Sequence, residues 1–270
     1  MSNMLLMCLN GWGGKLHDGL IPYLQSASPD VLCLQEVVHT PASSKEWLTY
    51  KDNGVSLPQR SNFFAEVCEA LPQHIAFFCP AARGDLWDGD KRVDSQWGIA
   101  TFVRKTIPII AQKQGFVHGC FRPNGYGEHP RSRSAHAVRL FDFKQRQPVT
   151  ICHMHGLRDP DGKHDTEARL VQAERLAALS MAVSEEGDMR VVCGDFNVLP
   201  DSQTLELLRK YGYIELVTEL NFTDTRTSHY KKPGRFADYM CVSSETVYSH
   251  FDVVRDPEVS DHCPLILEIG

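Results

Sequence analysis

The chain has 270 residues, 42% of them apolar and 23% charged, and a formal net charge of −6. That length can bury a full core, in one large domain or in two small ones. No uncharged apolar stretch reaches the roughly 18 residues of a transmembrane helix, so none is expected. No lysine- or arginine-rich run occurs, which argues against a broad nonspecific grip on nucleic acid but does not exclude a nuclease.

The nine cysteines are scattered, and none of them forms a CxxC pair. Several lie inside strand-like runs, which predicts buried free thiols in a reducing cytoplasm. The N-terminal MSNMLLMCLN has neither a basic region nor a small-residue cleavage site, so it is interpreted as a core strand and not as a signal peptide. We therefore expect a cytoplasmic protein without a membrane association or an obligate protein partner.

Apolar periodicity predicts strands that cluster in pairs, with helices between the clusters. Strict βαβ alternation is absent, which disfavours a simple Rossmann sheet, and the eight regular βα units of a TIM barrel are missing as well. No internal repeat or linker is found, so residues 1–270 are expected to form one domain. The expected elements are strand 4–9, helix 15–27, strand 31–37, helix 61–71, strands 75–79, 98–103, 107–112, 135–142 and 149–154, helices 165–183 and 201–210, and strands 236–242, 249–254 and 264–269.

Three polar stretches rich in Gly, Pro, Ser and Asn are interpreted as loops. They are residues 39–60, 83–97 and 118–134. Long loops of this kind tend to build the rim of a binding site in a compact domain.

The segment VVCGDFNVLP, residues 191–200, is the most informative part of the chain. Its apolar run stops at Gly194 and is followed by Asp195 and Asn197, whose spacing places both side chains on one face of an extended strand end. Other polar residues at or just past the ends of apolar runs are Asn10, Glu36, His155, Asp238, Asp261 and His262. If these strands belong to packed sheets, their ends can converge at one edge.

Each of these residues also has a simpler interpretation when it is taken alone. Glu36 fits a solvated carboxylate at a strand end, and Asn197 fits a turn residue before Pro200. Asp195 precedes the helix at 201–210 by too many residues to cap it, which favours a functional role. Asp238 lies within an apolar strand, where an unpaired carboxylate is costly, and His262 is the expected partner.

The residue types together suit the hydrolysis of a phosphate ester. This reaction needs neutralised phosphate oxygens, an activated water and help for the leaving oxygen. Carboxylates with oxygen-rich neighbours select a hard cation such as Mg²⁺ or Mn²⁺. Histidines can protonate a leaving group or stabilise developing charge. The pattern therefore predicts a hydrolytic metal site.

Five ordered motifs make the chain resemble the endonuclease/exonuclease/phosphatase superfamily, which has the DNase-like fold. They are LQEV around Glu36, HGL at 155–157, GDFN at 194–197, FADYM around Asp238 and SDH at 260–262. The resemblance covers essentially the whole chain, from Asn10 to His262. It implies an α/β (α+β) four-layered sandwich, with two mixed β-sheets packed face to face and helices on the outside. It also implies a phosphoesterase that depends on Mg²⁺ or Mn²⁺.

The resemblance assigns a role to each matching residue. Glu36 resembles the chief metal carboxylate, Asn10 its polar neighbour, and Asp261 a second carboxylate on the metal side. In the catalytic group, Asp195 resembles the residue that orients or deprotonates the attacking water, and Asn197 resembles an amide that holds water or phosphate. His262 resembles a phosphate-binding histidine, and Asp238 resembles the carboxylate that fixes its ring. His155 resembles a candidate acid for the leaving oxygen. Arg133 stands in about the place of a substrate-binding arginine that contacts the phosphate.

The chain departs from the DNA-repair branch of this superfamily at residues 155–157, where that branch carries a tyrosine and asparagine motif. This makes abasic-site cleavage less favoured than hydrolysis of another phosphodiester by an activated water. The expected partner is a phosphate-ester substrate, with nucleic acid among the candidates. The alternatives are a phosphatase acting on a small phosphomonoester, such as a sugar or inositol phosphate, and a catalytically inactive binding relative. The last is disfavoured because no key position is lost.

Overall fold

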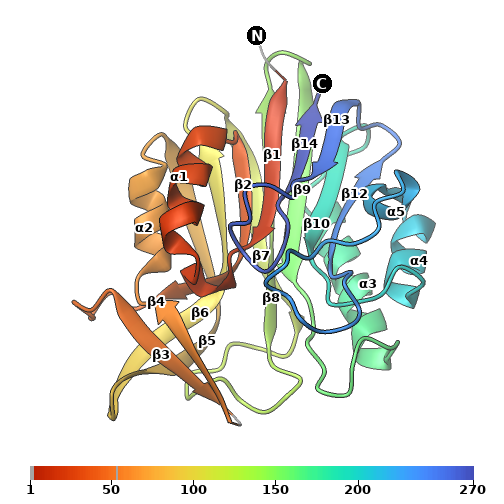
Figure 1. Cartoon of the computed structure of the whole chain (residues 1–270). Coiled ribbons are helices and arrows are strands. Elements are labelled where there is room, and N and C mark those ends of the chain that lie inside the picture. The colour runs from red at the N-terminus through yellow and green to blue at the C-terminus, as the bar shows by residue number, and fades with distance from the viewer. Residues whose placement is uncertain (1–2, 53) are drawn as a thin grey trace.

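The computed structural model describes residues 3–52 and 54–270, in which two mixed β-sheets pack against each other (Figure 1). Over this range one sheet has eight strands, in the order β13-β14-β1-β2-β6-β5-β3-β4, and the other has six, in the order β11-β12-β10-β9-β8-β7. The elements are β1 (Met4–Asn10), η1 (Trp12–Gly14), α1 (His17–Ala27), β2 (Val31–His39), β3 (Trp47–Asp52), β4 (Val55–Arg60), α2 (Phe63–Ala70), β5 (His74–Asp88), β6 (Lys91–Arg104), β7 (Ile109–His118), β8 (Arg133–Asp142), β9 (Gln147–His155), α3 (Glu167–Met181), β10 (Met189–Asp195), α4 (Gln203–Lys210), β11 (Tyr213–Glu215), α5 (Leu216–Glu219), β12 (Asp238–Ser243), β13 (Tyr248–Val253) and β14 (Leu265–Ile269).

The strand β1 shows why the central strands are apolar on both faces. Leu6 and Cys8 join the core between the two sheets, whereas Met7 and Leu9 pack against the helices outside the first sheet. Because successive side chains of a strand point to opposite faces, a strand covered on both sides needs an unbroken apolar run. Helices α1 and α2 cover the first sheet, and α3 and α4 cover the second (Figure 1). The predicted four-layered sandwich is confirmed.

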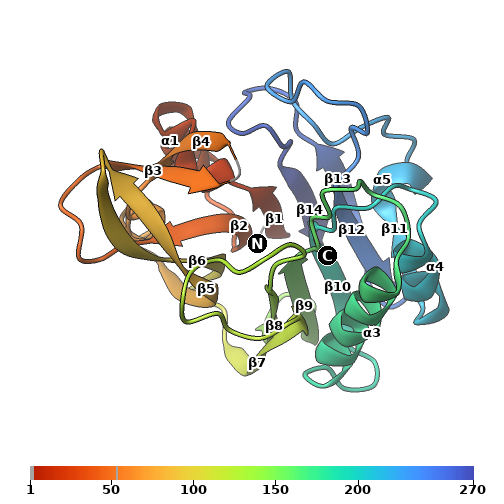
Figure 2. The same ribbon diagram turned by 90° about the horizontal axis from the view of Figure 1, so that it is seen from below.

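The strands that carry the predicted site end at one edge of the sandwich. β1 runs parallel to β2 in the first sheet, and β9 runs parallel to β10 in the second. The carboxyl ends of β1 and β2 lie at the lower edge in Figure 1, and Figure 2 views the molecule from that side. The helix α3 connects β9 to β10, and Thr166 caps its N-terminus with a side chain that accepts a hydrogen bond from the Arg169 N–H.

Two of the three predicted loops are largely strands, so that prediction was wrong. Residues 39–60 contain the β3–β4 hairpin, and residues 83–97 extend β5 and β6 into a long hairpin that turns at Gly89-Asp90. Leu86 is fully buried inside this extension. Most of the other side chains of this extension are polar because they contact solvent and oppositely charged neighbours, as in the Arg92–Asp85 ion pair of 2.6 Å. The third stretch, 118–134, is a loop except at its ends, where β7 stops and β8 starts.

All nine cysteines are free, as expected. Cys68 is partly buried and Cys120 is exposed, while the others are buried. In the two described ranges, no helix is long and apolar enough to cross a membrane.

Candidate active site

Three of the predicted residues lie side by side across the second sheet. In the parallel ladder of β9 and β10, Asp195 is paired with His155. In the antiparallel ladder of β10 and β12, the same Asp195 is paired with Asp238. Register alone therefore places two carboxylates and an imidazole in one row, although they are far apart in the sequence.

The first sheet contributes from the end of β1 and from a bulge within β2, where the sequence predicted a strand end. Asn10 is the last residue of β1 and is fully buried. Glu36 lies where the pairing of β2 with β6 shifts between Leu34 and Val37, and its φ is +54°. A bulge with a non-glycine residue in the left-handed region re-aims a side chain at a cost in backbone strain, and such residues cluster at functional sites.

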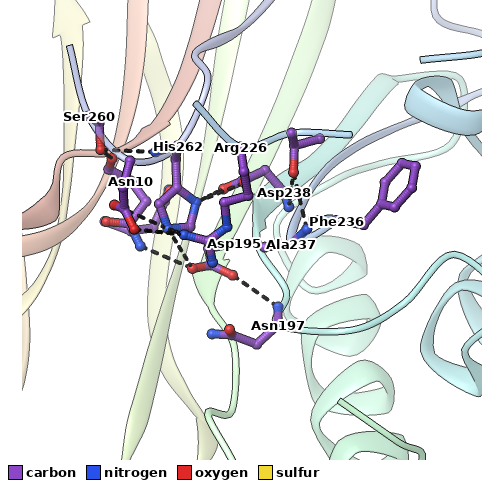
Figure 3. Close-up of polar contacts among 12 residues, drawn as sticks. Asn10, Asp195, Asn197, Arg226, Phe236, Ala237, Asp238, Ser260 and His262 are labelled. Carbon is purple, nitrogen blue, oxygen red and sulfur yellow. Dashed lines mark hydrogen bonds and ion pairs between the residues drawn. The ribbon is translucent and has the colours of Figure 1, made fainter. Parts of the chain in front are cut away.

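Asp195 is held from both sides (Figure 3). Its Oδ2 accepts a 3.0 Å hydrogen bond from Asn10 Nδ2, and its Oδ1 accepts one of 3.0 Å from the backbone N–H of Asn197. The Oδ1 of Asn10 in turn accepts from the Trp12 N–H at 3.0 Å, which fixes the orientation of this amide. The carboxylate of Asp195 therefore has one position, which suits a residue that must orient a water.

The glycine before Asp195 is required by the close packing of β10 against β9. Gly194 has a φ of +143°, and a Cβ atom at this position would lie 2.1 Å from the carbonyl oxygen of Met154. A side chain would push β10 away from β9 and so displace Asp195 from His155.

Asp238 and His262 form a buried pair, as predicted. The Nδ1 of His262 lies 2.8 Å from both carboxylate oxygens of Asp238, and its Nε2 lies 3.7 Å from Asp195 Oδ2 (Figure 3). Burial, together with the charge of the nearby Arg226, lowers the pKa of His262 to about 4. The ring is therefore neutral at pH 7, with its Nδ1–H donating to Asp238.

Glu36, Asp195 and Asp261 form a crowded group of carboxylates. Burial raises the pKa of Glu36 to about 7, and the charges of Asp261 and Asp195 raise it as well. The Oδ1 of Asp261 is buried and has no hydrogen-bond partner among the described residues. Like charges held together beside an unpartnered oxygen suit a divalent cation, and an all-oxygen donor set suits Mg²⁺ or Mn²⁺. The residues present thus fit the metal that the sequence predicts.

A second candidate metal group consists of Asp195, Asp238 and His262, whose ligand atoms lie within 4.8 Å of one another. These atoms already have hydrogen-bond partners. The ring of His262 contacts Asp238 through Nδ1 and Arg226 through Nε2, and both oxygens of Asp195 accept hydrogen bonds. We therefore favour the side of the site with Glu36 and Asp261 for the metal.

Trp97 contacts both Arg133 and His155 at the edge of the site. The guanidinium of Arg133 lies 4.8 Å from the centre of the Trp97 ring, and that ring lies 5.4 Å from the imidazole of His155. Arg133 is only 3% exposed, and its Nε has no hydrogen-bond partner in the described chain. Burial lowers the pKa of Arg133 to about 10, whereas the charges of Glu36 and Asp195 oppose this shift. The side chain stays cationic and is available to an anion.

The predicted proton donor, His155, is also buried and uncharged. Its Nε2 lies 3.7 Å from Asp195 Oδ2, and its Nδ1 has no partner among the described atoms. Burial and the charge of Arg133 lower its pKa well below the usual value. In the free protein His155 can donate a hydrogen bond as a neutral imidazole.

The rim of the site is reinforced by contacts between segments that are distant in the sequence. Arg131, in the loop between β7 and β8, pairs with Asp52 at 2.8 Å and donates to the hydroxyl of Tyr50 at 2.6 Å. These contacts join the loop to the β3–β4 hairpin, which lies at the left in Figure 2. Lys163, in the loop after β9, donates to the carbonyl oxygens of Gly234 and Phe236 and so joins two further rim segments.

The structure brings all nine predicted site residues to one edge of the sandwich, while the roles assigned to them stay predictions. Sequence reasoning missed Arg226 and Lys163. Arg226 and Lys163 lie in polar connections without apolar periodicity. In such segments the sequence does not distinguish a cation in a site from a cation exposed to solvent. The alternation Thr225-Arg226-Thr227 was the only local sign, since it is typical of a short extended segment.

Comparisons with known proteins agree with this geometry. The sequence model of the Endonuclease/Exonuclease/phosphatase family matches residues 7–262. The chain therefore belongs to this family, and its general chemistry is that of a phosphoesterase. A search of the curated proteins gave no match.

Several solved structures share the fold at low sequence identity. An endonuclease/exonuclease/phosphatase from Bacteroides vulgatus has a TM-score of 0.66 at 15% identity, covering 100% of this chain and 99% of that one. A mannosyl-6-phosphatase from Bacteroides thetaiotaomicron has a TM-score of 0.66 at 15% identity, covering 99% of each chain. The human Nocturnin catalytic domain with bound sulfate has a TM-score of 0.66 at 16% identity, covering 99% of this chain and 94% of that one.

Proposed function

We propose that this protein is a divalent-metal-dependent phosphoesterase that hydrolyses a phosphodiester by in-line attack of an activated water. The observation that carries the proposal is the position of Arg133. A buried guanidinium with an unpartnered Nε lies within the electrostatic reach of Glu36 and Asp195. The site thus offers a cation for an anionic substrate beside carboxylates for a metal, as hydrolysis of a phosphate ester requires.

The residues divide the work as follows. Glu36 and Asp261 would hold Mg²⁺ or Mn²⁺, which supplies charge neutralisation at a phosphate oxygen. Asp195, fixed by Asn10 and by the Asn197 N–H, orients the attacking water and accepts its proton.

On the other side of the phosphate, Arg133 binds a non-bridging oxygen through charge-assisted hydrogen bonds. The neutral ring of His155 donates a hydrogen bond to an oxygen of the ester. Asp238 keeps the ring of His262 in one tautomer and one orientation.

A second candidate is a phosphatase acting on a small phosphomonoester such as a sugar or inositol phosphate. The charges of the neighbouring β5–β6 hairpin favour it, because Arg83 pairs with Asp94 and Arg92 pairs with Asp85. Cations paired in this way are less available to the backbone of a long nucleic acid. One protein of similar fold is named a mannosyl-6-phosphatase.

A substrate panel tests the proposal and separates its two forms. Plasmid DNA, bis(p-nitrophenyl) phosphate and several sugar and inositol phosphates are incubated with the protein in Mg²⁺, in Mn²⁺ and in EDTA. We expect hydrolysis that EDTA abolishes and Mg²⁺ restores, with Asp195→Asn as the inactive control. Turnover that is insensitive to EDTA, or that is equal in the Asp195→Asn variant, would contradict the proposal.

A further inference from the structure

Arg226 is a buried arginine that meets the last two residues of the SDH motif. It is only 5% exposed. Its Nη1 donates to Asp261 Oδ2 at 3.0 Å. The same Nη1 contacts Nε2 of His262, which lies beside Arg226 in Figure 3. An arginine side chain stays protonated in proteins, so a positive charge is buried here. Arg226 therefore lies inside the site, although none of the five family motifs contains it.

The segment that carries Arg226 is held on both sides by hydrogen bonds. The hydroxyl of Thr225 accepts hydrogen bonds from the N–H groups of Ala237 and Asp238 at 3.1 and 3.2 Å. On the other side, the Thr227 N–H donates to the Asp261 carbonyl at 3.2 Å, and Arg226 forms a β-bridge with His262. The segment is thus inserted between the start of β12 and the SDH motif, which fixes the direction from which the guanidinium enters.

The contact with Arg226 changes what His262 can offer a substrate. Because the Nδ1–H of His262 is used by Asp238, its Nε2 carries the lone pair and accepts from the arginine. Because a guanidinium only donates, a ring in this arrangement presents no N–H from Nε2 to a phosphate oxygen. The guanidinium of Arg226 is itself a positive donor at this position.

The guanidinium also has N–H donors that no side-chain hydrogen bond in the described chain uses. It carries five N–H groups in a planar fork, and the side-chain hydrogen bonds found for it in the described chain all use Nη1. Its Nε is buried and unpartnered among the described residues. A buried donor without a partner is costly unless a ligand or water satisfies it.

We propose that Arg226 is a catalytic residue that binds a non-bridging oxygen of the substrate phosphate, the role that the family resemblance assigns to His262. His262 and Asp261 then act as positioning residues that hold the guanidinium from two sides. With Arg133 as the other cation, two buried arginines bind the phosphate. This inference rests on the proposed phosphoesterase function. The competing interpretation is that Arg226 only neutralises Asp261.

Binding of inorganic phosphate tests the inference without requiring turnover. Calorimetry in the presence of Mg²⁺ compares the wild type with Arg226→Gln, Arg226→Lys and the control Arg209→Gln, which removes an exposed arginine from α4. We expect Arg226→Gln to weaken phosphate binding about tenfold or more, Arg226→Lys to weaken it less, and Arg209→Gln to leave it unchanged. Phosphate affinity equal to the wild type in Arg226→Gln, or no phosphate binding by the wild type, would overturn the inference.

The lysine variant keeps the experiment decisive if Arg226→Gln does not fold, because it retains the charge beside Asp261 but loses the planar fork. Wild-type affinity in Arg226→Lys then counts against direct binding by the guanidinium.

A double variant tests the positioning role. If His262 acts through Arg226, adding His262→Ala to Arg226→Gln weakens phosphate binding no further, whereas independent contacts would add.

Hydrolysis of the best ester in the panel gives a second readout. Arg226→Gln should lower kcat by about 10²-fold, since the contact strengthens as charge develops on the phosphate. An unchanged kcat and KM would favour the purely structural role. If the wild type hydrolyses no ester with Mg²⁺, the proposed function fails, while the phosphate-binding comparison still decides whether Arg226 binds the anion.

Discussion

The crowded carboxylates predict that Glu36 destabilises the metal-free protein. Its pKa rises from 4.5 to about 7 on folding. This difference of roughly 2.5 pH units, at about 1.36 kcal/mol per unit, corresponds to about 3 kcal/mol. Because Glu36 is partly exposed, solvent screening reduces the expected value to about 2 kcal/mol. In EDTA at pH 8, Glu36→Gln should therefore unfold with a free energy about 2 kcal/mol above the wild type.

The pH dependence follows from the direction of the shift. Below pH 4.5 the carboxyl of Glu36 is protonated in both the folded and the unfolded states, so it causes no loss of stability. As the pH rises, the unfolded state releases its proton first, and the wild type loses stability until the folded pKa of about 7 is passed. The stability difference between Glu36→Gln and the wild type should therefore fall below about 1 kcal/mol at pH 5.

Urea unfolding in EDTA at pH 5 and pH 8, followed by circular dichroism, measures both differences. A series with Mg²⁺ at pH 8 should stabilise the wild type more than Glu36→Gln, because the metal binds the ionised carboxylate of the folded state. The reasoning would be refuted if Glu36→Gln were less stable than the wild type at pH 8 in EDTA. It would also fail if the difference were the same at both pH values.

Three further substitutions test the geometry of the site. Asp195→Asn should lower kcat by about 10³-fold or more while the unfolding midpoint stays close to that of the wild type, and a normal rate would exclude this residue as the base. Asp238→Asn should lower kcat by about 10²-fold, because it releases the ring of His262. In steady-state kinetics, the kcat of the double variant Asp238→Asn/His262→Ala should be little lower than that of His262→Ala alone. Gly194→Ala should destabilise the protein by at least about 3 kcal/mol in urea, because its Cβ would lie 2.1 Å from the Met154 carbonyl, and a wild-type midpoint would contradict the tight packing of β10 on β9.

Local pattern could predict the elements that are built on apolar runs. The strand end at Asp195 was recognisable because an unbroken apolar run of strand length followed by a polar residue is a strong signal. The same signal at Glu36 marks a bulge, because β2 continues to His39. The pairing of Asp238 with His262 could also be inferred, since a carboxylate inside an apolar strand needs a partner. The β5–β6 extension around Leu86 was missed because a hairpin whose outer faces are polar resembles a loop in composition. One buried side chain is too few to produce the alternation of apolar and polar residues that predicts a strand.

By itself, the sequence determined which residue types follow the apolar runs of the central strands, and from them it predicted a carboxylate-rich hydrolytic site on a layered α/β frame. Only the tertiary structure decided which charges face one another there. The register of β9, β10 and β12 puts His155, Asp195 and Asp238 in a row, and register depends on pairing between distant segments. The entry of Arg226 depends in the same way on a segment inserted between β12 and the SDH motif. Local propensity cannot encode such contacts, because their free energy arises only when both partners are already in place.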